Sequence, residues 1–268
     1  MPPRPPIQPL LSSGSSESFR REFESAGDRA EIEGVIELVL KQLDVLGLSE
    51  RHRAFVEVGR AEKKNYAQRL STALAQKFAD ALRPKFKTIL PTVDGRRQES
   101  RSMGAGGLKK LDVNHSTPEI GLGLGVSIKT INFLDIKTRR YTKNIKRVDG
   151  ELRAEAQDYH RRQPFSVLAA VIFMPRDSAE DGAGEKSSLR HAWEVFRGRA
   201  GRNSSDDPHE RFERLWIGLY ETGTEQLGEI RFFEAGVEAP LRGAPSETVG
   251  FGDVIAEITA TFEGRNRK

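Results

Sequence analysis

Apolar residues recur along this chain at spacings that separate helices from strands. In residues 30–46 and 61–83 they recur every three or four positions, the period of one helix face. Pro84 ends the second of these segments, because proline disfavours helical geometry in the residue before it. Ser49 is a suitable cap for a further helical stretch between them. We therefore expect mostly helical structure in the first third of the chain.

Strand patterns dominate the middle and the end of the chain. Residues 166–174, SVLAAVIFM, form a continuous apolar run of strand length, which predicts a strand covered on both faces. Two strands are expected within residues 110–130, and Trp193, Phe196, Trp216 and Tyr220 are expected in the core. The remaining patterns predict strands at 87–93, 214–220 and 229–234, helices at 150–163 and 249–262, and loops at 96–107, 176–188 and 198–209. Mixed strands flanked by helices predict an α/β fold.

Composition divides the chain into three parts. Residues 1–18 are rich in proline and serine and bury little apolar surface, so we expect a disordered tail. Residues 19–60 form an N-terminal helical segment, and residues 61–268 form the α/β domain. Across this domain no sequence segment repeats.

The bulk composition indicates a soluble, cytoplasmic protein. The chain has 268 residues, a net charge of +4 and no cysteine, which excludes disulfides and thiolate metal sites. No apolar run approaches the roughly 18 residues that a membrane-spanning helix needs, and the N-terminus lacks the features of a secretory signal. The net charge alone does not indicate nucleic acid, so the distribution of charge matters more.

The two strands within residues 110–130 each alternate apolar and polar positions. Side chains alternate across a strand, so Leu111 and Val113 point one way while Asp112 points the other. In the second strand the alternation predicts an apolar face for the core and a polar face directed outward. The apolar face holds Leu122, Leu124, Val126 and Ile128, and the polar face holds Gly123, Gly125, Ser127 and Lys129.

The register of the two strands decides whether Asp112 and Lys129 meet. If Asp112 lies opposite Ser127, the hairpin centre falls between Glu119 and Ile120, among residues typical of turns. Glu119 then lies about seven residues from Asp112, or roughly 23 Å along an extended strand, so it is not expected to join the site.

Asp112 followed by Ser127-Ile128-Lys129, within an order of helix, strands, helix and strand, resembles the PD-(D/E)xK nuclease superfamily, which includes type II restriction endonucleases. The resemblance covers about residues 61–175. It implies a restriction-endonuclease-like core, with a central mixed sheet flanked by helices. It also implies an Mg²⁺-dependent endonuclease that hydrolyses phosphodiester bonds of double-stranded DNA in restriction or phage defence.

Ser127 stands where most of that superfamily carries a second acid. Some Ser-x-Lys members supply the carboxylate from the following helix, where Glu151 and Glu155 are the candidates; others use the preceding helix, where Glu62 is the candidate. The resemblance makes Asp112, Ser127 and Lys129 the catalytic motif. Asp112 and the Ile128 carbonyl would bind Mg²⁺, which prefers oxygen ligands, and Lys129 would hold water or neutralise developing charge.

Basic residues follow the second strand. Residues 137–147 include Arg139, Arg140, Lys143, Lys146 and Arg147, which are expected to contact DNA phosphates or to form a solvated loop or helix start. A restriction enzyme that cuts a palindromic site is expected to be a two-fold homodimer, and a cognate DNA methyltransferase belongs to such a system.

Three alternatives stay open at this point. Asp112 and Lys129 could form an exposed cross-strand ion pair of little energetic value. The chain could be a catalytically inactive DNA-binding module with a nuclease fold, for which the replacement of an acid by Ser127 is the best indication. It could also be a subunit of a larger defence complex.

Overall fold

The computed structural model describes residues 60–97, 100–104, 107–135, 137–221 and 229–266. Within these ranges, side chains are described for residues 67–97 and from residue 111 onward. The predicted tail, the helix at 30–46 and the helix near Ser49 lie outside the described residues. None of the helices in these ranges combines the length and apolar character needed to cross a membrane.

Four helices and seven strands lie within the described residues, beginning with a helix and a run of four strands. The helices are α4 (Arg60–Leu82), α5 (Ile145–Arg162), α6 (Ser188–Phe196) and α7 (Phe251–Asn266), with short 3₁₀ turns at Arg176–Ala179 and Arg197–Arg199. The strands are β1 (Ser100–Gly104), β2 (Gly107–Leu111), β3 (Val113–Thr117), β4 (Gly121–Thr130), β5 (Val167–Pro175), β6 (Arg214–Tyr220) and β7 (Ile230–Glu234).

Five of the strands form one mixed sheet in the order β3-β4-β5-β6-β7. The central strands β4, β5 and β6 are parallel, and the edge strands β3 and β7 are antiparallel to their neighbours. The α/β class is thereby confirmed, as is the pairing of the last two predicted strands. Strands β1 and β2 form a separate antiparallel hairpin.

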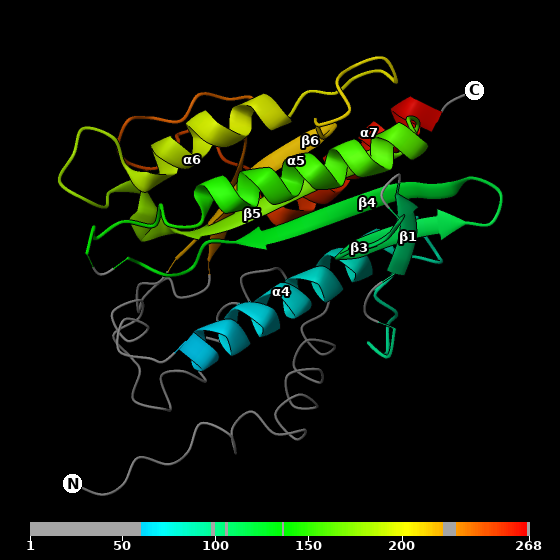
Figure 1. Cartoon of the computed structure of the whole chain (residues 1–268), viewed down its shortest axis with the longest axis horizontal. Helices are drawn as coiled ribbons and strands as arrows, with labels where there is room; N and C mark the ends of the chain where they lie inside the picture. The colour runs from blue at the N-terminus through cyan, green and yellow to red at the C-terminus, as the bar shows by residue number, and fades with distance from the viewer. Residues whose placement is uncertain (1–59, 98–99, 105–106, 136, 222–228, 267–268) are drawn as a thin grey trace, which may run out of the picture.

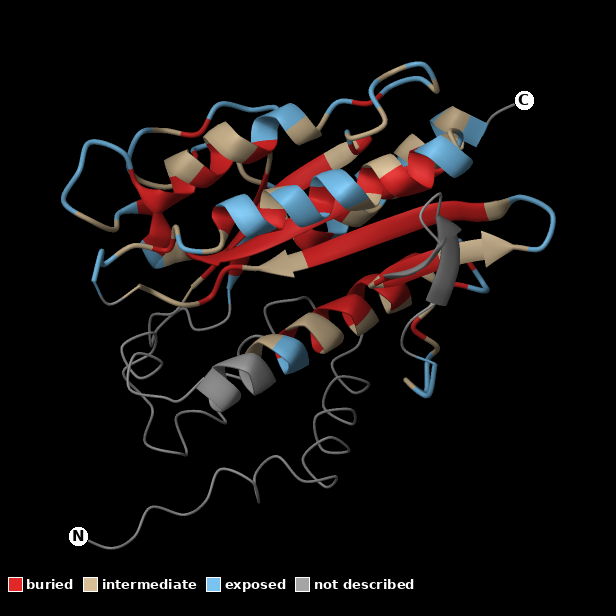
Figure 2. Cartoon of the chain, viewed as in Figure 1, coloured by how far each residue is buried: buried red, intermediate tan, exposed pale blue. Residues whose placement is uncertain are grey.

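Helices cover both faces of the sheet (Figure 1). α5 connects β4 to β5, and α6 connects β5 to β6. Both crossovers advance in the same direction across the sheet, and right-handed crossovers of this kind place their helices on the same face. α4 and α7, which pack on each other, cover the opposite face. Every residue of β5 is buried, as its apolar run predicts, and most exposed positions lie on the outer sides of the helices and in loops (Figure 2).

The face of β4 that carries Ser127 is not directed outward. Residues 122 to 128 are all buried, and Ser127 is 0% exposed, because α5 packs over this face. The prediction of an outward polar side was wrong, because alternation within one strand carries no information about what covers each face. The residues predicted for the core, Trp193, Phe196, Trp216 and Tyr220, are all buried.

A β-bulge interrupts the predicted alternation in β4. His115 pairs with Leu124 and Ser116 pairs with Leu122, so Gly123 is an extra residue in β4. Leu122 consequently lies with the cluster under α5, whereas Leu124 lies with the cluster under α4. The expectation that these two leucines share a face was wrong for this reason.

The first predicted strand is likewise divided in two. The chain bends at Asp112 between β2 and β3, so Leu111 packs under α5 while Val113 packs under α4. Gly125 lies against Leu111: a methyl group added there would come within 2.7 Å of Leu111 and 2.9 Å of Leu168. Continuous alternation through Asp112 therefore does not hold.

Several predicted boundaries change. Residues 87–93 contain only an isolated bridge between Leu90 and Asn114, and the predicted loop at 96–107 contains β1. α5 begins at Ile145 rather than at residue 150, so Gly150 lies within the helix. α6 was not predicted, although its buried residues Leu189, Ala192, Trp193 and Phe196 have helical spacing behind the capping Ser187.

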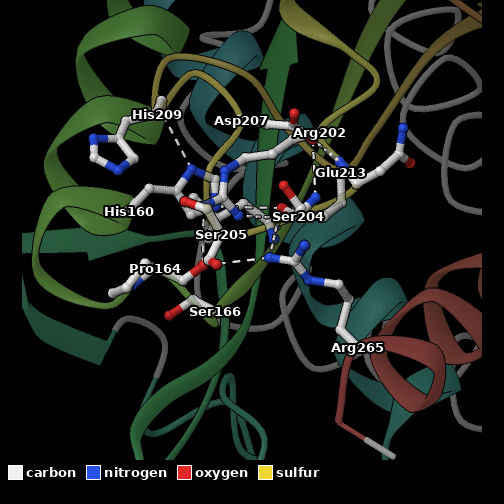
Figure 3. A network of polar contacts seen from close by, with 12 residues as sticks. His160, Pro164, Ser166, Arg202, Ser204, Ser205, Asp207, His209, Glu213 and Arg265 are labelled. Carbon is white, nitrogen blue, oxygen red and sulfur yellow. Dashed lines mark hydrogen bonds and ion pairs between the residues drawn. The ribbon is translucent and has the colours of Figure 1, made fainter.

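A buried carboxylate joins the starts of β5 and β6 to α5 and α7 (Figure 3). Glu213, 3% exposed, accepts hydrogen bonds from Arg202 Nη1 at 2.6 Å and from the Leu168 amide at 2.8 Å. Arg265 of α7 and His160 of α5 lie 3.4 and 3.3 Å from its oxygens. Burial would raise the pKa of Glu213, but His160, the amide and Arg202 together hold this pKa below its ordinary value.

We expect Glu213→Gln to lower the free energy of unfolding by about 3–5 kcal/mol at neutral pH, because Arg202 would stay buried without its counter-charge. Urea denaturation measures this change. A depressed carboxyl pKa stabilises the fold above the unfolded pKa, and this stabilisation is lost as pH falls through the folded pKa. The difference between wild type and variant should therefore shrink in acid.

Glu210→Gln, on the same loop but partly exposed, is the matched control and should change stability by less than about 0.5 kcal/mol. Equal stability of the Glu213 and Glu210 variants at neutral pH would contradict the role assigned to Glu213.

Candidate active site

Asp112 is fixed at the end of β4 by the bend between β2 and β3. β3 begins by pairing Val113 with Val126, and one further step along this register places Asp112 beside Ser127. The Asp112 carboxylate accepts a hydrogen bond from the Ile128 amide at 2.7 Å. The carboxylate therefore accepts the hydrogen bond that the backbone carbonyl of a neighbouring strand would otherwise accept from the Ile128 amide.

The Ile128 carbonyl lies on the same edge of β4. In a strand, the N–H and C=O of one residue point to the same neighbour, and those of the next residue point to the opposite one. Since the Ile128 amide points to Asp112, its carbonyl points to the side where β3 has ended. Two oxygen ligand types, a carboxylate and a backbone carbonyl, thus share this edge.

α5 brings a second carboxylate to β4. Glu155 Oε2 accepts hydrogen bonds from Ser127 Oγ and from Lys129 Nζ, both at 3.2 Å. Glu155 and Lys129 are largely buried, with side-chain exposures of 12% and 20%. Asp112 and Lys129 consequently do not form the exposed cross-strand pair that was the simplest alternative: each has a partner inside the fold.

Lys129 carries a positive charge in a site shielded from solvent. Burial pulls the pKa of its ammonium group down, but the nearby carboxylates of Glu155, Asp112 and Glu151 outweigh burial and raise this pKa above its ordinary value. Lys129 is therefore protonated at neutral pH. It can hold a water or stabilise an anion, but it cannot act as a proton acceptor.

Ser127 lies under α5 with its hydroxyl on Glu155, so it orients that carboxylate and has no access to solvent. The other candidate acids differ in position. Glu151 is exposed and pairs with Arg147 one turn away on α5. Glu119 lies in the exposed hairpin turn, as expected from the register, and Glu62 lies on α4, where the described side chains begin only at residue 67.

The five predicted phosphate contacts lie in the β4–α5 loop and the first turn of α5. Arg139 and Lys146 are exposed, and Arg139 has a positive φ of 56°. Arg140 is partly buried and donates to the Lys186 carbonyl at 2.8 Å. Lys143 lies 3.8 Å from Asp135, and Arg147 pairs with Glu151, so these two already face acids.

Four arginines near residues 197–211 have different environments. Arg199 binds Asp149 of α5 through two hydrogen bonds, Arg202 is buried on Glu213, and Arg211 is exposed. The Arg197 guanidinium lies 4.7 Å from the centre of the Trp193 ring. Arg199 and Arg202 thus pair with acids that lie 50 and 11 residues away in the sequence, which composition alone does not indicate.

The donor set of this site fits Mg²⁺. Among the described residues, no three histidine, aspartate or glutamate side chains gather as a metal cluster. Mg²⁺ does not require one, since it is commonly held by one or two carboxylates together with waters and substrate phosphate. Asp112, Glu155 and the Ile128 carbonyl offer hard oxygen atoms of this kind around β4.

No protein-family model, curated protein sequence or solved structure matches this chain.

Replacement of Glu155 by glutamine should lower the pKa of Lys129, because burial would then act with less opposition from negative charge. NMR titration of the ¹³Cε signal of Lys129 measures this pKa. Glu151→Gln should lower it less, since Glu151 is exposed and hydrogen-bonded elsewhere. An unchanged titration in the Glu155 variant would contradict the pairing.

Proposed function

We propose that this chain is a Mg²⁺-dependent endonuclease of the PD-(D/E)xK type that hydrolyses phosphodiester bonds of double-stranded DNA. The observation that carries the proposal is the convergence of Asp112, Glu155 and Lys129 at one end of β4. Glu155 makes up for the acid that Ser127 replaces. The mixed sheet, with α5 following β4, supports a restriction-endonuclease-like core.

Each residue has a role that follows from its environment. Asp112, Glu155 and the Ile128 carbonyl would hold Mg²⁺, and Ser127 would orient Glu155. When bound, the metal ion supplies positive charge that stabilises the phosphate in the transition state. Lys129, kept protonated by the carboxylates around it, would place a second positive charge where the phosphate oxygens become more negative.

The basic loop beside the site supports a polyanionic substrate. Arg139, Arg140 and Lys146 would contact DNA phosphates next to the scissile bond, which gives affinity without sequence preference. A role in restriction or phage defence, a two-fold homodimer and a cognate methyltransferase belong to the same proposal.

Plasmid cleavage in Mg²⁺ tests the site. Asp112→Asn, Glu155→Gln and Lys129→Met should each lower the cleavage rate by about 10²-fold or more, because each removes a charge that acts on the transition state. Glu119→Gln, in the exposed turn, should cleave like wild type. EDTA should stop cleavage, and added Mg²⁺ should restore it.

Cleavage that survives in both the Asp112 and Lys129 variants would overturn the site assignment. DNA binding without cleavage by wild type, in Mg²⁺ and in Mn²⁺, would instead favour a non-catalytic DNA-binding module. Negligible DNA affinity at low salt would favour a subunit of a larger complex.

DNA binding should distinguish the cations that have no acidic partner among the described residues from those that have one. Arg139→Ala and Lys146→Ala should each weaken binding and reduce the slope of log Kd against log salt by about one. Arg147→Ala is the matched comparison and should cost less, because Arg147 is already paired with Glu151. Equal losses in all three variants would contradict the contribution of this ion pair.

A further inference from the structure

A cluster of cations lies where the loop before α5 meets the start of α6. Arg140 extends along Gly182, where an added methyl group would come within 3.1 Å of its side chain, and its guanidinium is tied to the Lys186 carbonyl at 2.8 Å. These contacts fix Arg140 through its stem and one nitrogen. Lys146 lies exposed in the first turn of α5.

His191, in the first turn of α6, lies beside this loop: its amide donates to the Ser187 carbonyl at 3.1 Å, next to Lys186, whose carbonyl accepts from Arg140. The charges that act on it are those of Arg140 from the loop, Lys146 from α5, Lys186 from the loop before α6, and Glu194 from α6 itself. Burial and the three cations hold the pKa of His191 below its ordinary value, against the opposing effect of Glu194. The histidine is therefore neutral at pH 7 in a positive field.

The nearby acids do not balance these cations. Glu194 is shared between Lys186 at 2.7 Å and Arg190 at 3.1 Å. Asp181, on the adjacent loop, accepts hydrogen bonds from the Tyr141 amide and from the amide and hydroxyl of Ser188. Arg140 and Lys146 have no acidic partner among the described residues.

We propose that Arg140, Lys146 and His191 form a binding site for a phosphate group of the nucleic-acid backbone, and that His191 takes up a proton when the phosphate binds. A phosphate would add negative charge among three cations and so favour the imidazolium form, which can then donate a hydrogen bond to it. Nucleic-acid affinity should therefore rise as pH falls. This inference deepens the proposed function, but it concerns binding alone.

The experiment measures the Kd of the full chain for a fluorescent DNA duplex in EDTA, from pH 8 to pH 5.5 at constant ionic strength. Wild-type affinity should rise by at least about threefold over this range, since one linked proton changes affinity by at most about tenfold per pH unit. His191→Gln should remove this extra rise. His191→Arg should bind more tightly than wild type at pH 8 and depend little on pH.

His209→Gln is the matched control, because His209 is partly buried on a different loop, and it should keep the wild-type pH dependence. Equal pH dependence in wild type and His191→Gln would overturn the proposal, as would an unchanged affinity of His191→Arg at pH 8. NMR titration of His191 separates the source of the phosphate. A shift with inorganic phosphate but none with the duplex would overturn the assignment to nucleic acid.

Because EDTA prevents metal-dependent cleavage, the two proposals fail separately. If the protein binds DNA with linked proton uptake but does not cleave it, the phosphate site is supported and the nuclease proposal is wrong. If cleavage requires Asp112 but DNA affinity and its pH dependence do not depend on His191, the nuclease proposal is supported and the phosphate site is wrong.

Discussion

The buried carboxylate of Glu213 is the point on which the arrangement of layers depends. It lies at the start of β6 and binds the first residues of β5, the end of α5 and α7 through Leu168, His160 and Arg265. Arg202 brings in the loop before β6. An unpaired charge at this depth would be costly, so the fold is stable only when these segments converge. The two helical layers are thereby tied to the sheet at the end opposite the candidate site.

With that end of the sheet fixed, α5 extends over β4 and determines how far the residues of the candidate site are buried and which charged groups they meet. The helix buries Ser127, limits the exposure of Lys129 and places Glu155 within hydrogen-bond distance of both. Low exposure strengthens the charge interactions, which is why the carboxylates keep Lys129 protonated despite burial. Lys146, in the first turn of this helix, is one of the charges that act on His191 of α6, so α5 links the candidate site to the phosphate-binding cluster proposed around His191.

Local pattern predicted much of the fold. The apolar run of β5, the periodic spacing of α4 and the strand pattern of residues 214–220 depend only on neighbours along the chain, and each element lies close to its predicted range. The pairs from Val113 to His115 have the register that would place Asp112 opposite Ser127, which the turn residues near Glu119 allow, but the bulge moves the centre of the hairpin from between Glu119 and Ile120 to Glu119 itself. The bulge at Gly123 and the division of β2 from β3 at Asp112 did not follow, because they depend on how each strand end meets its covering helix. α6 was missed although its spacing was present.

The sequence by itself determined which residue types are available to the site: Asp112 and Lys129 on either side of one hairpin turn, Ser127 in place of an acid, and glutamates on the following helix. Only the tertiary structure decided that Glu155 reaches Lys129 while Glu151 turns outward to Arg147. It also decided which cations of the described residues have an acidic partner, since Arg199 pairs with the partly exposed Asp149 and Arg202 with the buried Glu213. The physical reason is that both outcomes depend on the position of α5 over the sheet, which is set by packing between residues far apart in the chain.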